Sequence, residues 1–197
     1  AHGILAQSIG GGGGLVGDAA AGPLSTSIPT AIISSAGNDG AGGDVSVTVA
    51  SGAEVRTIGD YAFAVVAQSL GGGGGFGGDS SGLFAGSAFG GGVGTGTVDV
   101  AVDGTVSAFA TGAVGVFAQS QAFDNNETVT VNVSGAVTGG TGSDGVAVFV
   151  SAGVDNVVDI AAGGSVKAGA SNAFAIRFVG DFGAAEGSVT NVVNAGT

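Results

Sequence analysis

Residues 129–137 read VTVNVSGAV, and this stretch decides the fold. Strict alternation places Val129, Val131 and Val133 on one face of a β-strand, with Thr130 and Asn132 on the other. A glycine turn and a further valine follow directly. The stretch therefore predicts a half-buried strand, a tight turn and a second short strand.

The same pattern recurs along the chain, as a structural repeat would. Its other copies are VSVTVASGAEV at 45–55, VDVAVDGTV at 98–106, VVDIAAGGSV at 157–166 and VTNVVNAGT at 189–197. A second segment recurs in phase with it: GILAQS at 3–8, AVVAQS at 64–69, GVFAQS at 115–120, AVFVSA at 147–152 and AIRFVG at 175–180.

The spacing of the second segment gives the length of the repeat. Its aliphatic positions are Ile4, Val65, Val116, Val148 and Ile176, which lie 61, 51, 32 and 28 residues apart. The unit is thus about 30 residues long, and the first two copies carry insertions at about 9–43 and 70–96. A unit this short buries its apolar face only against neighbouring copies. We therefore predict an all-β fold, a parallel β-solenoid, and treat residues 1–197 as a single fragment of a longer chain.

Composition agrees with this fold and excludes several kinds of partner. The chain has 44 glycines, no cysteine and a net charge of −12. Glycine weakens helices, and a negative chain with three basic residues repels nucleic acid and anionic lipid. Because of this charge we expect no nucleic-acid partner. The apolar runs are too short to span a bilayer, so we also expect no membrane-embedded segment.

The A-Q-S strand differs from the valine strand because both of its faces are apolar. We expect Phe63, Val65 and Ala67 on one face, and Ala64 and Val66 on the other. The second face would form a column through the copies: Leu5, Val66, Phe117, Phe149 and Arg177. Something outside the coil should cover this column.

The two insertions are the expected cover. Each opens with five glycines, at residues 10–14 and 71–75, which could form either a loose hinge or a tightly packed extended segment. Apolar side chains in the insertions favour order, because exposing them to water is costly. The predicted interaction surface comprises Leu5, Val66, Phe117, Phe149, Phe76, Phe84 and Phe89. Its partner is either the chain's own flap or another chain.

The strings GILAQSIGGGGG and VVAQSLGGGGGFGGD, with the intervening alternating strands, resemble the passenger-domain repeats of Gram-negative autotransporters. That resemblance implies a right-handed β-helix displayed outside the cell or on the outer-membrane surface. The last two copies depart from the pattern, since they lack both A-Q-S and polyglycine.

Catalytic groups are sparse. The one histidine, His2, stands near the start of the sequence, so no Ser-His triad can be assembled and we expect no enzyme. We place the three basic residues, Arg56, Lys167 and Arg177, in different columns of the solenoid, where they form no groove. Gln and Ser of A-Q-S recur in three copies and predict stacked side-chain hydrogen bonds at a corner.

One segment has the pattern of a metal site. Residues 139–147, GGTGSDGVA, fit the nonapeptide of calcium-binding β-rolls, with Asp144 as the candidate ligand. No tandem copy follows, so the alternative is a plain glycine turn, and we assign no cofactor.

These observations predict a structural surface or fibre module that extends from the cell surface or self-associates, with neighbouring repeats or a surface ligand as partners. An adhesin that binds a host or environmental ligand through the glycine-rich flaps is the first alternative. A polysaccharide-degrading β-helix enzyme is the second.

Overall fold

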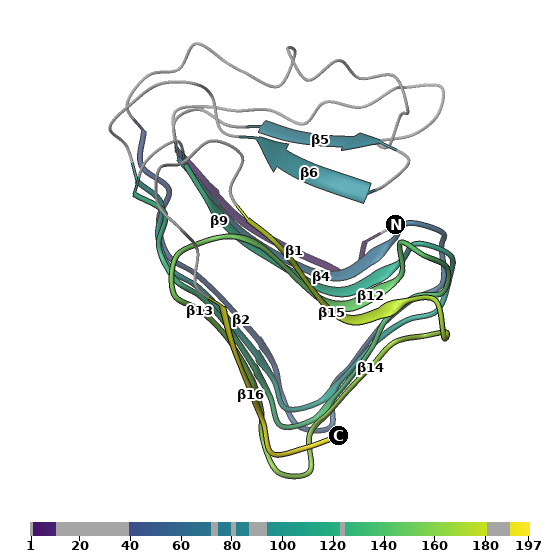
Figure 1. Ribbon diagram of the computed structural model, residues 1–197. Coiled ribbons are helices and arrows are strands. Elements are labelled where there is room, and N and C mark those ends of the chain that lie inside the picture. Colours follow the sequence, from purple (N-terminus) through teal and green to yellow (C-terminus); the bar gives the residue numbers. More distant parts are fainter. Residues whose placement is uncertain are drawn as a thin grey trace.

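The computed structural model describes residues 2–10, 40–71, 75–79, 82–86, 94–122, 125–180 and 190–197. Within these ranges every regular element is a strand, and none is a helix. Three sheets of parallel strands form the three sides of a triangular coil (Figure 1). The predicted all-β, parallel architecture is confirmed, and it agrees with a β-solenoid.

Each sheet collects one segment of the repeat. The A-Q-S segments form the first, here called the AQS sheet: β1 (Ile4–Ile9), β4 (Phe63–Leu70), β9 (Val114–Gln121), β12 (Val146–Ala152) and β15 (Phe174–Val179). The alternating segments form the valine sheet: β2 (Val45–Val49), β7 (Val98–Val102), β10 (Val129–Val133), β13 (Asn156–Ile160) and β16 (Thr190–Asn194). The residues after each glycine turn form the short-strand sheet: β3 (Glu54–Thr57), β8 (Thr105–Ala108), β11 (Ala136–Thr138) and β14 (Ser165–Lys167).

The register of the strands matches the alignment of the repeats. In the AQS sheet the five aliphatic positions pair in the predicted order, Ile4, Val65, Val116, Val148 and Ile176. The valine sheet stacks Val47, Val100, Val131, Val158 and Val192 in the same way. Equivalent positions of the repeat therefore form columns that run across the strands of each sheet.

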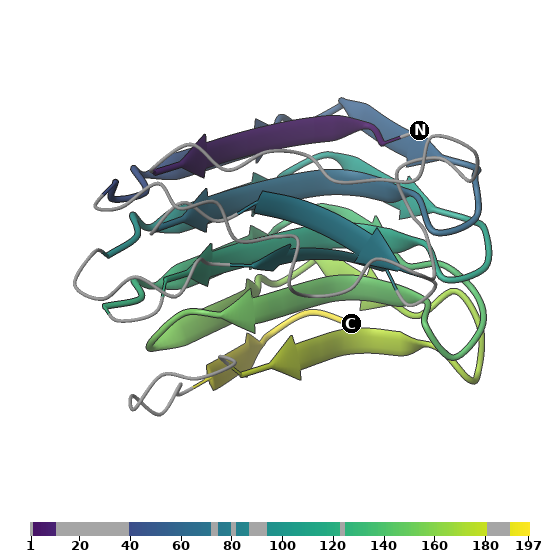
Figure 2. The same cartoon turned by 90° about the horizontal axis from the view of Figure 1, so that it is seen from above.

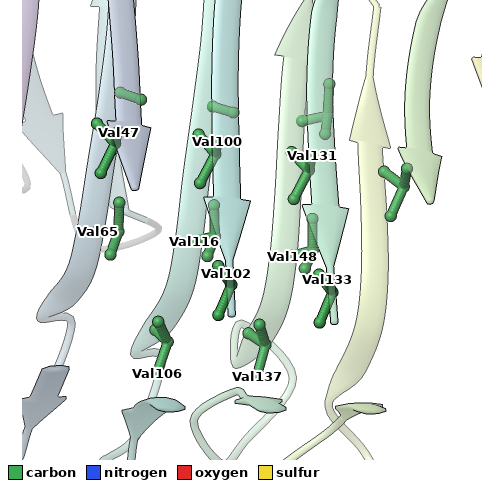
Figure 3. Close-up of a cluster of buried hydrophobic side chains, with 14 of the residues drawn as sticks. Val47, Val65, Val100, Val102, Val106, Val116, Val131, Val133, Val137 and Val148 are labelled. Atoms are coloured by element: carbon green, nitrogen blue, oxygen red, sulfur yellow. The ribbon is translucent and has the colours of Figure 1, made fainter. Parts of the chain in front are cut away.

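The core lies inside the triangle, where valines from the three sheets meet (Figure 3). Val100, Val106 and Val116 come from one coil and from three different sheets, and each is at most 1 % exposed. Burying a valine side chain stabilises a fold by about 1.5–3 kcal/mol, so the repeated valines supply much of the stability of each coil.

The turn between the valine sheet and the short-strand sheet requires glycine. A Cβ added to Gly104 would lie 2.3 Å from the carbonyl oxygen of Ala53 in the neighbouring coil. Successive turns therefore stack in direct backbone contact, which explains the glycine at this position in the later coils, Gly104, Gly135 and Gly164; the equivalent residue of the first coil is Ala53.

The two insertions begin after neighbouring strands of the AQS sheet, at the paired residues Ile9 and Leu70. A hairpin, β5 (Gly75–Asp79) with β6 (Gly82–Gly86), is antiparallel and lies over the outer side of the AQS sheet (Figures 1 and 2). Ile9 and Leu70, where the insertions are predicted to begin, still belong to strands β1 and β4.

Candidate functional site

The outer face of the AQS sheet carries part of the predicted interaction surface, namely Leu5, Val66, Phe117 and Phe149. Parallel pairing brings Leu5, Val66, Phe117, Phe149 and Arg177 into one column, in the predicted order. Leu5 is 53 % exposed, whereas Val66 and Phe117 are at most 1 % exposed. The column is thus closed in the middle and open at the β1 end.

Strands β4, β9 and β12 are buried over their whole length. An apolar strand with both faces covered was the expectation for this segment, and it is confirmed. Leu70 and Val66 join the phenylalanines in a cluster on the outer face, separate from the valine core.

Aromatic rings run along this face in edge-to-face contact. The ring centroids of Phe63 and Phe117 lie 5.6 Å apart at 77°, and those of Phe117 and Phe149 lie 5.2 Å apart at 71°. Such pairs contribute about 0.5–1.5 kcal/mol beyond the burial of their area. The guanidinium carbon of Arg177 lies 5.2 Å from the Phe149 ring, so a cation–π contact ends the stack.

The position of Phe63 differs from the prediction. Alternation places it with Val65 and Ala67, which is wrong, because Phe63 packs in the outer cluster with Phe117. Ala64 and Val65 instead both belong to the inner core. The alternation therefore breaks at the start of the strand.

The break recurs in the later coils and has a steric basis. Ala147 and Val148 are both in the inner core, and Val116 follows a glycine at the same position. A Cβ added to Gly115 would lie 2.9 Å from Cγ1 of Val137. Two successive residues point inward here, and the first must be small because it meets the core valines.

Glutamine side chains form a hydrogen-bonded ladder beside the aromatic stack. Gln7 Nε2 donates to Gln68 Oε1 at 2.7 Å, and Gln68 Nε2 donates to Gln119 Oε1 at 2.8 Å. Gln119 Nε2 then donates to Gln121 Oε1 and, at 3.4 Å, to Ser151 Oγ. A neutral hydrogen bond contributes about 1 kcal/mol net, but breaking one leaves a buried amide unpaired at greater cost. The predicted stacking of the glutamines is confirmed.

The serines of A-Q-S hold the corner between the AQS sheet and the valine sheet. Ser8 Oγ accepts the Gly43 amide at 2.7 Å, and Ser69 Oγ accepts the Gly96 amide at 2.8 Å. In the third copy Ser120 Oγ accepts a backbone amide only 7 residues further along, at 3.1 Å. Each serine thus fixes the point at which the chain returns to the coil, whatever the number of residues between the serine and that point.

The first glycine of each polyglycine run lies in a narrow neck. Gly71 N donates to Gln121 O at 3.0 Å, which continues the ladder of the sheet by one residue. A Cβ on Gly71 would lie 2.4 Å from Gly94 O, and one on Gly10 would lie 2.1 Å from Gly40 O. For these two glycines the tightly packed alternative holds, because the outgoing and returning segments touch. Residues 11–14 and 72–74 lie outside the described ranges.

The aromatic residues of the second insertion are placed only in part. Phe76 pairs with Ala85 in the β5–β6 hairpin, and Gly77 pairs with Phe84. The predicted surface residue Phe89 lies outside the described residues. The position of the hairpin over the AQS sheet fits the predicted flap (Figure 1).

The carboxylates of Asp60 and Asp103 accept hydrogen bonds from a neighbouring coil. Asp60 Oδ1 accepts the amide of Thr111 at 3.1 Å, and Asp103 Oδ1 accepts the hydroxyl of Ser134 at 2.6 Å. Each pair joins one coil to the next, so these carboxylates hold turns together.

Asp144, the candidate calcium ligand, lies in the turn between β11 and β12. A backbone bond from Gly145 N to Gly142 O, 3.1 Å long, closes this turn. Over the described part of the chain, no group of three or more His, Cys, Asp or Glu side chains could hold a metal ion. Calcium binding there stays a prediction.

The single histidine belongs to the end of the aromatic stack. His2 Nδ1 accepts the amide of Phe63 at 3.1 Å, and the two rings are 5.5 Å apart. Burial, followed by the nearby amino-terminal charge, lowers the pKa of His2 and favours the neutral ring that this bond requires.

The placement of the basic residues needs a correction. Arg56 and Lys167 share one column of the short-strand sheet, with Ser107 and Thr138 between them, so the prediction of separate columns is wrong for this pair. The sequence contained the information for this column, because each of its four residues directly follows the inward-facing valine of its short strand. Three strand spacings, about 14 Å, separate the two cations.

No family model, curated protein or solved structure matches the chain. Among the described residues, no helix is long and apolar enough to cross a membrane.

Proposed function

We propose that the chain is a structural module of an extracellular or outer-membrane surface protein, built as a right-handed parallel β-helix. The observation that carries the proposal is the use of its repeated polar residues. Gln68 and Gln119 bond along the ladder, and Ser8 and Ser69 bond the returning backbone. These side chains maintain stacking, and none of them is left to bind or transform a substrate.

Two arguments support the finer parts of the proposal. Parallel strands joined by a crossover in one sheet are right-handed in about 98 % of cases, which favours a right-handed coil. Location outside the cell rests on the resemblance of A-Q-S-[IL]-polyglycine strings to autotransporter passengers. Neighbouring repeats or further copies would be the partners of such a module.

An adhesin is the second candidate, and the β5–β6 hairpin favours it. The hairpin lies outside the triangular coil and is joined to it through the glycine neck (Figures 1 and 2). A segment displayed in this way could contact a ligand without disturbing the stacked coils.

One comparison separates the two candidates. We would purify the 197-residue chain and a matched variant in which residues 70–95 are replaced by QAFDNN, the segment at 121–126 that closes the third coil. A structural module predicts rods or filaments in negative-stain images of the wild-type chain, without saturable binding to a glycan array. Saturable glycan binding that the replacement abolishes would instead establish the adhesin, and turnover of polyuronate by the wild-type chain would contradict both.

A further inference from the structure

The outer side of β9 is buried, although the third coil carries no insertion of its own. Phe117 on this strand is 1 % exposed. The rings of Phe63 and Phe149 contact it from neighbouring strands of the same sheet, so they cover its edges and not its outward side. The third coil passes from β9 to β10 through the short segment 122–128, which closes the corner. We therefore expect the layer above Phe117 to come from another coil.

The β5–β6 hairpin lies where this layer is needed. It belongs to the second insertion and lies over the middle of the AQS sheet, whose central strand is β9 (Figures 1 and 2). Among the described strands, β5 and β6 pair only with each other, so no backbone ladder ties them to the coil. A two-stranded hairpin is marginally stable alone and needs an apolar surface to pack against. The outer cluster of the AQS sheet is such a surface.

The register of the hairpin gives it one apolar face. Successive residues of a strand alternate between two faces, and directly paired residues share a face. One face of the hairpin therefore has three apolar positions and one glycine: Phe76, Gly78, Leu83 and Ala85. The other face has four glycines, one acid and one aromatic position: Gly75, Gly77, Asp79, Gly82, Phe84 and Gly86. The first face is the better match for an apolar cluster.

We infer that the β5–β6 hairpin is a strap between coils, and that its Phe76 and Leu83 face packs on the outer cluster around Phe117. Stacked sheets lie about 10 Å apart, with side chains from both layers filling the space between them. The insertion starts in the second coil, after Leu70, and in this arrangement it covers the third coil. The strap thus couples β9 to the second coil by apolar burial, in addition to the hydrogen bonds between β4 and β9.

This inference goes beyond the proposed function. Rods or filaments can form whether or not the hairpin is a strap, so the negative-stain result and the test below fail independently. The strap gives the hairpin a role within the chain, whereas the adhesin candidate gives it an external ligand.

A matched pair of variants tests the strap, because the two aromatic positions of the hairpin belong to opposite faces. Phe76→Ser and Phe84→Ser each remove one phenylalanine from the whole 197-residue chain. Amide hydrogen exchange is followed in residues 114–121, and the fluorescence of anilinonaphthalene sulfonate reports exposed apolar surface. We expect Phe76→Ser to speed exchange in β9 about tenfold and to raise the dye signal, and Phe84→Ser to stay within about twofold of the wild type.

A double-mutant cycle shows whether Phe76 acts through Phe117. In a Phe117→Ala background, the decrease in urea midpoint caused by Phe76→Ser should fall below about half of its wild-type value, because the contact is already lost. In a Val131→Ala background, which alters the inner core, the decrease should be unchanged. Equal effects of the two serine variants, a larger effect of Phe84→Ser, or full additivity of Phe76→Ser with Phe117→Ala would overturn the inference.

Discussion

Replacing the Gln68 amide by a carboxyl should make the stability of the solenoid depend on pH. Gln68 is 0 % exposed and lies in the middle of the ladder, where it accepts from Gln7 and donates to Gln119. In Gln68→Glu the protonated carboxyl can make both bonds, because it has an O–H donor and an acceptor oxygen. The ionised carboxylate can only accept, and it is buried away from water.

Burial disfavours the ionised form, so the new carboxyl has a folded-state pKa above its unfolded value of about 4.3. The fold then binds this proton more tightly than the unfolded chain does. Stability is therefore retained below pH 4.3 and is lost as the pH rises toward the folded pKa, by about 1.4 kcal/mol per pH unit. If the folded pKa reaches 7, the loss is about 3.3 kcal/mol at pH 7 and approaches about 3.7 kcal/mol well above it.

The assay is urea unfolding followed by far-UV circular dichroism between pH 4 and 7, with the wild-type free energy subtracted at each pH. Gln7→Glu is the matched control, because Gln7 belongs to the same column but is exposed at its open end. We expect the loss only in Gln68→Glu. If both variants lose stability in parallel as the pH rises, the middle of the ladder is not a position shielded from water.

Three further perturbations test other parts of the site by urea unfolding. Phe117→Ala removes the centre of the aromatic stack and should cost about 3–5 kcal/mol, whereas Leu5→Ala should cost under about 1 kcal/mol because half of that side chain is exposed; equal losses would contradict the closed column. Gly71→Ala places a Cβ 2.4 Å from a backbone carbonyl and should cost at least about 2 kcal/mol, while Gly52→Asn, at φ +80° with open space around it, should stay within about 0.5 kcal/mol. Burial lowers the pKa of His2, so the unfolded chain binds its proton first and stability should fall as the pH drops below about 6.5; His2→Ala should remove that part of the pH dependence, and an unchanged profile would show that the neutral ring is not required.

The repeated strands could be predicted because each physical requirement has a direct signature. Val129, Val131 and Val133 alternate since one face of the strand is buried, and equal strings align in register since stacked coils reuse the same contacts. The ladder of Gln7 and Gln68 was also predictable. When the same Gln-Ser pair recurs at the same position of each repeat, stacking places equal side chains next to each other, where they can form hydrogen bonds.

Other features could not be predicted, because they depend on local backbone geometry and not on the spacing of residue types along the sequence. Phe63 faces outward because the two residues after it, Ala64 and Val65, both face inward, and strict alternation does not allow two successive inward residues. The neck at Gly71 could not be distinguished from a loose hinge. The sequence shows five equal glycines, and only the structure shows that Gly71 packs against the carbonyl of Gly94. The shared column of Arg56 and Lys167 was missed because the short strands were not aligned on their inward valines.

The corner held by the serines has a consequence for how such chains can change. From the serine to the amide that it accepts, the chain runs 35 residues in the first copy, 27 in the second and 7 in the third. Closing a fivefold longer loop costs only about 1.4 kcal/mol more. Sequence can therefore be gained, lost or exchanged between Gly71 and Gly94 while the strands of the three parallel sheets keep their register. A scaffold of this kind could acquire new binding loops, by natural insertion or by design, without being rebuilt.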